Sequence, residues 1–285
     1  MMLTEWLDRL PLGAVRTPRP QVAVVRLAGV IGPMGPWRGG LSIASLAAPL
    51  ERAFALKPLA AVALVLNSPG GAATQSALIA TRIRALAQEK GIPVMAFVED
   101  VAASGGYWLA AAADEIYASE TSIVGSIGVI SASFGFHELL ARLGIRRRLY
   151  TAGERKSLLD PFLEENPADV ERLKALQVEV HEAFKAHVRA RRGSKLKASE
   201  EVLFNGEFWT GKRALELGLV DGIGELRETL RRRFGEKVRL RVVGGERRWL
   251  RRRFGLAADP SPPAEWAPEL IATLEARALW ARFGL

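Results

Sequence analysis

The sequence predicts an α/β fold in which a mostly parallel sheet is covered by helices. Two short, wholly apolar runs, 60–66 and 93–98, are typical of strands buried on both faces. Each run is followed by a stretch with helical spacing of its apolar residues, 72–90 and 104–113. Strands and helices that alternate at this spacing indicate βαβ units, and hence parallel strands.

The other expected elements extend this pattern along the chain. Strands are expected at 21–28, 115–118, 126–130, 147–150 and 237–243, and helices at 41–56, 167–192, 212–218, 225–234 and 269–283. The helix at 167–192 has the clearest start, with Asn166 as a capping residue and Pro167 in the first helical position. Residues 151–166 read as a polar loop, and 257–268, with four prolines, as a linker. We therefore expect an N-terminal segment (1–20), a main domain (21–243) and a basic C-terminal extension (244–285).

Composition limits the chemistry that the chain can perform. A hydrophobic share of 49% with 25% charged residues is ordinary for a soluble globular protein. There is no cysteine, which excludes disulfides and thiolate metal sites, and the three histidines are too scattered to indicate a metal site. We expect no cofactor. His181 and His187 fall in a charged helical stretch, where a solvated face is the plainer interpretation.

Localisation is predicted from what the sequence lacks. Residues 1–19 alternate apolar and charged side chains, without the apolar stretch of a signal peptide. The longest uncharged stretch, 58–81, is broken by Pro-Gly-Gly, which argues against a membrane-spanning helix. The chain is expected to be cytoplasmic, or at most attached to the periphery of a membrane.

The positive charge is concentrated near the C-terminus. Residues 229–285 hold 13 Lys and Arg against 6 Asp and Glu, which accounts for +7 of the formal net charge of +9. Such a segment can bind nucleic acid or an anionic lipid surface, or it can be the solvated face of a helix. We expect no nucleic-acid partner, and leave peripheral contact with an anionic membrane open.

The segment Asn67-Ser68-Pro69-Gly70-Gly71 is the first candidate site. It joins an expected buried strand to an expected helix, so it lies at the carboxyl edge of the sheet, where α/β folds usually bind ligands. Glycines leave backbone N–H groups uncovered, and such donors beside a helix start are suited to holding an oxyanion. Taken alone, the segment is also compatible with an ordinary turn.

The second candidate is Ser104, in Ala-Ser-Gly-Gly-Tyr-Trp at the next strand-to-helix junction. Small neighbours give a substrate carbonyl room, and the N–H of Gly105 supplies a second donor. A serine nucleophile needs a base, and no histidine is expected in a loop on this edge of the sheet. A Ser-Lys pair is the remaining option, with Lys156 as candidate and Ser126 placed to orient its amine. Each of these residues, read singly, has a plain structural interpretation.

Taken together, the motifs resemble those of the signal peptide peptidase A family of serine peptidases (peptidase family S49), in its short single-domain form. The similar segments are 67–71, 103–108, 124–129, 153–157, 204–211 and 214–221. The resemblance covers roughly 22–243 and implies a ClpP/crotonase-type fold of repeated ββα units. It implies Ser104 as nucleophile, Lys156 as general base and Ser126 as the residue that positions the lysine. It also implies an oxyanion and substrate-binding site made by the amides of Gly71 and Gly105 beside Gly70.

The same resemblance implies partners and substrates. Single-domain members of the family form rings in which serine and lysine come from adjacent protomers, so a homo-oligomer is expected. Their substrates are cleaved signal peptides and other short or unfolded polypeptides. Members usually carry an N-terminal membrane anchor, and this sequence shows none.

Three alternatives remain open on the sequence alone. A crotonase-like acyl-CoA hydratase or isomerase would share the fold and would use carboxylates, for which Glu99 and Asp100 are candidates. A scaffold without catalytic activity would use the basic C-terminal segment to bind a membrane or nucleic acid. A capsid-maturation protease of the same family is the third.

Overall fold

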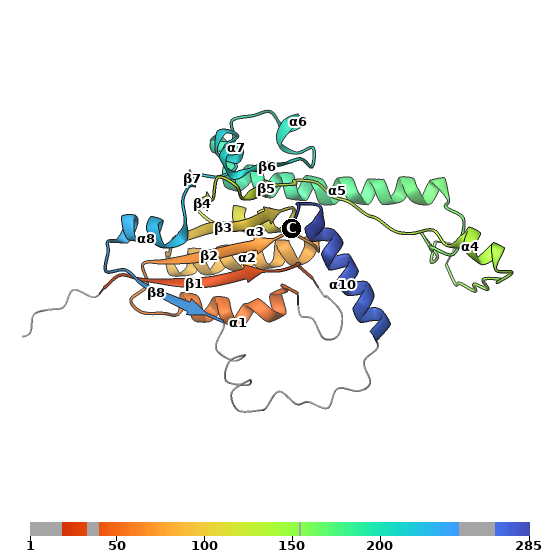
Figure 1. Ribbon diagram of the computed structural model, residues 1–285, viewed down its shortest axis with the longest axis horizontal. Helices are drawn as coiled ribbons and strands as arrows, with labels where there is room; N and C mark the ends of the chain where they lie inside the picture. The colour runs from red at the N-terminus through yellow and green to blue at the C-terminus, as the bar shows by residue number, and fades with distance from the viewer. Residues whose placement is uncertain (1–18, 33–39, 154, 245–265) are drawn as a thin grey trace, which may run out of the picture.

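The described part of the chain is built on an eight-stranded sheet, shown in Figure 1. The computed structural model describes residues 19–32, 40–153, 155–244 and 266–285, without the side chains of 266–272 and 275. The strands are β1 (Gln21–Ala28), β2 (Ala61–Ser68), β3 (Val94–Ala103), β4 (Glu115–Ala118), β5 (Ile123–Gly125), β6 (Phe208–Thr210), β7 (Gly222–Ile223) and β8 (Arg239–Val243). Their order is β6-β5-β3-β2-β1-β8, with β4 paired to β3 and β7. Every pairing is parallel except that of β5 with β6, which confirms the predicted fold class.

Helices pack on both faces of this sheet. They are α1 (Ile43–Phe54), α2 (Ala73–Lys90), α3 (Gly105–Ala111), α4 (His137–Arg142), α5 (Pro167–Arg192), α6 (Glu200–Leu203), α7 (Gly211–Glu216), α8 (Leu226–Phe234) and α10 (Trp266–Ala281). The main core lies between the sheet and side chains of α1, α2, α3 and α5. Among the described residues, no helix is long and apolar enough to cross a membrane.

The opposite face of the sheet is covered in two halves. Leu230 of α8 packs over Met95 and Phe97, in the first half of β3. Phe283, beyond α10, packs over Val101 and Ala103 in the second half. The first half of β3 pairs with β4 and the second half with β5. The long strand β3 therefore runs through the centre of the sheet, and its second half reaches the carboxyl edge.

Most predicted elements are confirmed, and the exceptions have physical causes. The strand expected at 126–130 is wrong: the strand is Ile123–Gly125, and Ser126, with φ of 54°, turns the chain out of the sheet. The strand expected at 147–150 is also absent, since these exposed residues pair with no described strand. β3 continues to Ala103 instead of ending at Val98.

The predictions for both ends fall partly outside the described residues. The segment 1–18, the basic run 245–253 and most of the expected linker lie there. Helix α10 begins at Trp266, so the last three residues of the expected linker, 266–268, are helical instead. The division into a main domain and a C-terminal extension stays a prediction.

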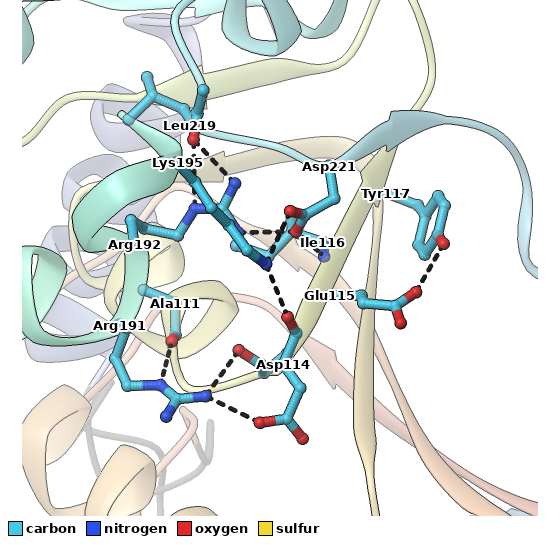
Figure 2. A network of polar contacts seen from close by, with 12 residues as sticks. Ala111, Asp114, Glu115, Ile116, Tyr117, Arg191, Arg192, Lys195, Leu219 and Asp221 are labelled. Carbon is cyan, nitrogen blue, oxygen red and sulfur yellow. Dashed lines mark hydrogen bonds and ion pairs between the residues drawn. The ribbon is translucent and has the colours of Figure 1, made fainter. Parts of the chain in front are cut away.

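A buried ion pair fixes the C-terminal end of α5 (Figure 2). The side chain of Arg192 is 1% exposed and donates to Asp221 at 2.6 Å and to the carbonyl of Gly218 at 2.7 Å. Asp221 also accepts from the backbone N–H of Ile116, at the start of β4, at 2.8 Å. Asp221 and the carbonyl of Gly218 thus compensate the charge of Arg192, and the contact of Asp221 with Ile116 connects α5 to the sheet.

A second set of contacts joins α5 to α3. Arg191 donates to the carbonyl of Ala111 at 3.2 Å and to Asp114 at 2.9 Å, as Figure 2 shows. The hydroxyl of Tyr107 in α3 donates to the carbonyl of Leu219 at 2.8 Å, and burial raises the pKa of this tyrosine. Helix α3 is therefore fixed by its own Tyr107 and by Arg191 of α5.

The buried pair predicts an uneven response to two substitutions on α5. Arg192→Met leaves Asp221 paired with Lys195 but removes the donor to the buried carbonyl of Gly218, and should lower the free energy of unfolding by about 1–3 kcal/mol. Arg189→Met removes an exposed pair with Glu200, which water and salt screen, and should lower the free energy of unfolding much less. Urea denaturation of both variants measures the difference, and equal losses would contradict a buried anchor at Arg192.

Candidate active site

Two strand-to-helix junctions meet at the carboxyl edge of the sheet. One joins β2 to α2 through Gly70 and Gly71, and the other joins β3 to α3 through Ser104. The contact leaves no space for a side chain, since a Cβ on Gly70 would lie 2.8 Å from Ser104 Cβ and 2.9 Å from Gly105 N. The structure thus brings together the two motifs that the sequence singled out.

Ser104 occupies an unusual backbone conformation. Its φ is 51° and its ψ is −123°, a region that residues with a side chain rarely adopt. The backbone N–H of Ser104 donates to the carbonyl of Gly125 at 2.8 Å, and its carbonyl accepts from the N–H of Trp108 at 3.0 Å, inside α3. Strain of this kind persists only where surrounding contacts enforce it, and it is most common at functional sites.

Two backbone N–H groups lie beside this serine. A Cβ on Gly105 would lie 3.4 Å from the amide nitrogen of Gly71, so the two peptide groups are neighbours. Neither N–H donates a hydrogen bond to another described residue. A Cβ on Gly71 would overlap the carbonyl oxygen of Ile31 at 2.1 Å, and one on Gly105 would lie 2.4 Å from Ser76 Oγ. The pair therefore stays bare, and two bare donors can hold a developing oxyanion.

Ser126 lies next to the residue that binds Ser104. It follows Gly125, whose carbonyl accepts from Ser104, and its own N–H donates to the carbonyl of Glu207 at 2.6 Å. Its side chain is buried and its φ is 54°. Of the described non-glycine residues, only Ser104, Ser126 and Leu159 have a positive φ. Two strained serines at one edge of the sheet match the predicted positions, although their catalytic roles stay predictions.

Lys156 does not meet these serines within one chain. It is exposed, and its backbone N–H donates to the carbonyl of Gly153 in a turn. This turn belongs to the segment between β5 and α5, which runs out to α4 beyond the N-terminal end of α5 (Figure 1). Within one chain, the proposed base Lys156 therefore lies away from the proposed nucleophile Ser104.

Two histidines that we expected on a solvated face contact the site instead. His187 hydrogen-bonds the carbonyl of Trp108 through Nε2 at 3.0 Å, and its ring stacks on the indole at 5.5 Å. His181 Nε2 hydrogen-bonds the carbonyl of Ile127, next to Ser126, at 3.1 Å. His181, Phe184 and His187 lie three residues apart and therefore share one face of the helix. This spacing could have predicted a buried face, but the charged residues between them led us to expect a solvated one.

The carboxylates of the crotonase alternative are occupied by partners. Glu99 forms a bidentate ion pair with Arg26, at 2.5 and 2.8 Å. Asp100 accepts from the side-chain amide of Asn67 at 2.6 Å. Both carboxylates are thus held by cross-strand contacts where β3 departs from regular pairing with β2.

Comparison with known proteins identifies the family. The sequence profile of peptidase family S49 matches residues 86–238, just over half of the chain. The chain belongs to peptidase family S49. The matched range includes Ser104, Ser126 and Lys156, and the mostly parallel sheet with flanking helices agrees with the ClpP/crotonase-like fold of S49 peptidases.

Individual relatives agree with the S49 assignment, with one difference in name. The chain is 33% identical to "Serine protease SPPA, chloroplastic" of Arabidopsis thaliana, over 73% of this chain and 31% of that protein. It is 35% identical to "Probable protease SohB" of Buchnera aphidicola, over 68% of this chain and 56% of that protein. It is also 50% identical to a Brucella abortus protein named "Na(+)/H(+) antiporter NhaA", over 98% of this chain and 39% of that protein. The chain thus spans less than two thirds of each relative, and the stretch shared with the Brucella protein contains the S49 match.

The contact of Gly105 with Ser76 predicts a compensating pair of substitutions. Gly105→Ala should lower the free energy of unfolding by about 1–3 kcal/mol, because the new methyl group meets Ser76 Oγ. Combining it with Ser76→Ala removes that oxygen and should recover most of the loss. Chemical denaturation of the wild type, both single variants and the double variant measures the coupling. Additive losses would show that this contact does not limit the site.

The burial of His187 predicts a pH dependence of stability. Burial lowers the pKa of His187 below its ordinary value of 6.5, and the nearby charge of Arg191 acts in the same direction, against the hydrogen bond to Trp108. As the pH falls through 6.5, the unfolded chain takes up this proton before the folded chain does. The contribution of His187 to stability is therefore present above that pH and is lost below it.

The check compares His187→Gln with the wild type. Unfolding free energies measured from about pH 7.5 to about pH 5 should fall less steeply in the variant, because the proton uptake is gone. An equal slope in the wild type and the variant would contradict a buried, neutral His187.

Proposed function

We propose that the chain is the catalytic part of a serine endopeptidase that hydrolyses short or unfolded peptides with a Ser104–Lys156 dyad. One observation carries the proposal: Ser104 stands in a strained junction beside two bare N–H groups, those of Gly71 and Gly105. A nucleophile with an adjacent oxyanion site is the minimum apparatus for acyl transfer. Membership of family S49 supports the same reaction class.

The proposed reaction proceeds by acyl transfer through Ser104. Neutral Lys156 takes the proton from the hydroxyl of Ser104 as Oγ attacks the peptide carbonyl, and the N–H groups of Gly71 and Gly105 bind the oxyanion. The C–N bond then breaks, and the protonated lysine gives its proton to the leaving amine. Water, activated by the same lysine, hydrolyses the acyl-enzyme and restores Ser104. The hydroxyl of Ser126 orients the lysine amine.

The proposal places Ser104 and Lys156 of one active site on neighbouring chains. The segment between β5 and α5 exposes many large apolar side chains, which a monomer would leave in water: Val129, Ile130, Phe134, Phe136, Leu139, Leu143, Ile145, Leu149, Tyr150, Phe162 and Leu163. Apolar patches of this extent usually mark an interface. A second copy of the chain would bury them and bring Lys156 to the neighbour's Ser104 and Ser126. We therefore propose a homo-oligomer in which each site is shared.

Cleaved signal peptides are the proposed natural substrates, by analogy with the relatives named for them, such as the "Putative signal peptide peptidase SppA" of Enterococcus faecium. Such peptides are extended and apolar, and would bind as an added strand at the edge of the sheet. The excess of basic residues in 229–285 supports peripheral contact with an anionic membrane, where these substrates occur. We also propose a cytoplasmic location.

The decisive experiment mixes two inactive variants. Ser104→Ala retains Lys156, and Lys156→Ala retains Ser104, so each should lose nearly all peptidase activity alone. Co-expressed in equal amounts, they should regain about a quarter of the wild-type activity, because a random mixture pairs intact Ser104 with an intact neighbouring Lys156 at one site in about four. Peptide hydrolysis and labelling of Ser104 by a fluorophosphonate are both measured.

The controls separate the possible failures. Lys174→Ala, an exposed lysine on α5, should keep full activity, which shows that loss of a surface charge is not the cause. Activity in Lys156→Ala alone would contradict the proposed base. Inactive single variants that stay inactive when mixed would contradict the shared site, and an active Ser104→Ala chain would contradict the nucleophile.

A further inference from the structure

The last residues of the chain fill a place on the sheet directly behind the candidate site. Helix α10 ends at Ala281, and Phe283 follows it with only 8% of its surface exposed. Phe283 belongs to a small apolar cluster, separate from the two larger apolar clusters of the fold. Its members are Val101, Ala103, Ile123, Trp280 and Phe283. Figure 1 shows the C-terminus at the carboxyl end of the sheet, in agreement with these contacts.

The residues of this cluster lie close in sequence to residues of the site. Ala103 is the last residue of β3 and immediately precedes Ser104. Ile123 begins β5, the strand that leads into Ser126. The ring of Phe208 in β6 meets that of Phe283 edge to face, with centroids 5.1 Å apart, and Phe208 pairs with Gly125. Phe283 therefore packs with β3 and β6, in a cluster against which Ile123 of β5 also packs.

Two of these strands, β5 and β6, are short. β5 and β6 are three residues long each, so their ladders contribute few hydrogen bonds. Ser104 and Ser126 both have a positive φ, and a strained conformation persists only where neighbouring contacts over-determine it. On the other half of this face, Leu230 of α8 covers β3 far from the serines. Phe283 thus packs on the half of this face that lies next to the strained residues Ser104 and Ser126.

We propose that the C-terminal segment 280–285 is a positioning element of the active site, with Phe283 as its anchor. Phe283 holds β3, β5 and β6 against one another, and so keeps Ser104 and Ser126 in the geometry needed for acylation. This role rests on the proposed function of Ser104. It assigns a catalytic purpose to a segment that otherwise only covers part of the sheet.

The test uses variants of the 285-residue chain and two independent measurements. Phe283→Ala empties the site, Phe283→Leu refills most of it, and Leu230→Val is the matched control on the other half of the same face. The first measurement is the rate of Ser104 acylation by a fluorophosphonate. The second is amide hydrogen exchange in 101–103 and 123–125, which reports strand order whether or not Ser104 is a nucleophile.

In the expected result, Phe283→Ala slows acylation and peptide turnover at least about tenfold with little change in KM, and speeds exchange in both strands, while the oligomer persists. Phe283→Leu should recover most of the rate. Leu230→Val should lower the melting temperature without changing acylation. A loss of rate confined to the variant with the empty site is what a positioning role requires.

Other outcomes would overturn the proposal. Faster exchange with unchanged acylation would make Phe283 a packing residue only, and faster acylation would make the segment an obstruction of the site. Unchanged exchange would show that the segment does not hold the strands. If the wild-type chain shows no acylation of Ser104, the proposed function fails, and the positioning role fails with it, even where the exchange data confirm docking.

Discussion

The structure depends on the close approach of two strand ends, where the backbone at Gly70 and Gly71 packs against Ser104 and Gly105. Parallel pairing places Ser68 opposite Ala102, after an irregularity in the ladder, so both junctions leave the sheet at one point. A side chain on any of the three glycines would overlap neighbouring atoms. The absence of side chains allows the contact, and the contact keeps two N–H groups free beside a serine. Folding and the proposed chemistry therefore require the same residues.

Helix α5 extends this constraint to the rest of the molecule. Its C-terminal end is fixed by the buried pair of Arg192 with Asp221, and its middle contacts Trp108 and Ile127 through two histidines. Its N-terminal part leads to the exposed apolar segment that carries Lys156 (Figure 1). One helix thus contacts α3, which follows Ser104, and leads to the proposed interface. Under the proposed function, assembly of the oligomer would bear on the geometry of the site through this helix.

The sequence predicted the elements that depend on neighbouring residues, and failed to predict those that depend on contacts between distant segments. Apolar runs and glycine pairs predicted β2, β3 and the helices after them, because burial and turn geometry act over a few residues. The strand before Ser126 was misplaced because its three residues, Ile123–Gly125, are held by β6, more than 80 positions later. The cover of β3 by Phe283 was missed for the same reason. The positive φ of Ser126 left no mark in the sequence.

The separation of Ser104 from Lys156 within one chain is physically reasonable for the proposed dyad. A lysine acts as a base only where its surroundings disfavour the charged form, which requires shielding from water. Lys156 is exposed, and the described residues near it offer no such enclosure. The strained Ser104 and the bare N–H groups are, by contrast, complete before any assembly. The base would then be the only component that a second chain must supply, so that an unassembled chain would hold a formed oxyanion site without hydrolysing peptides.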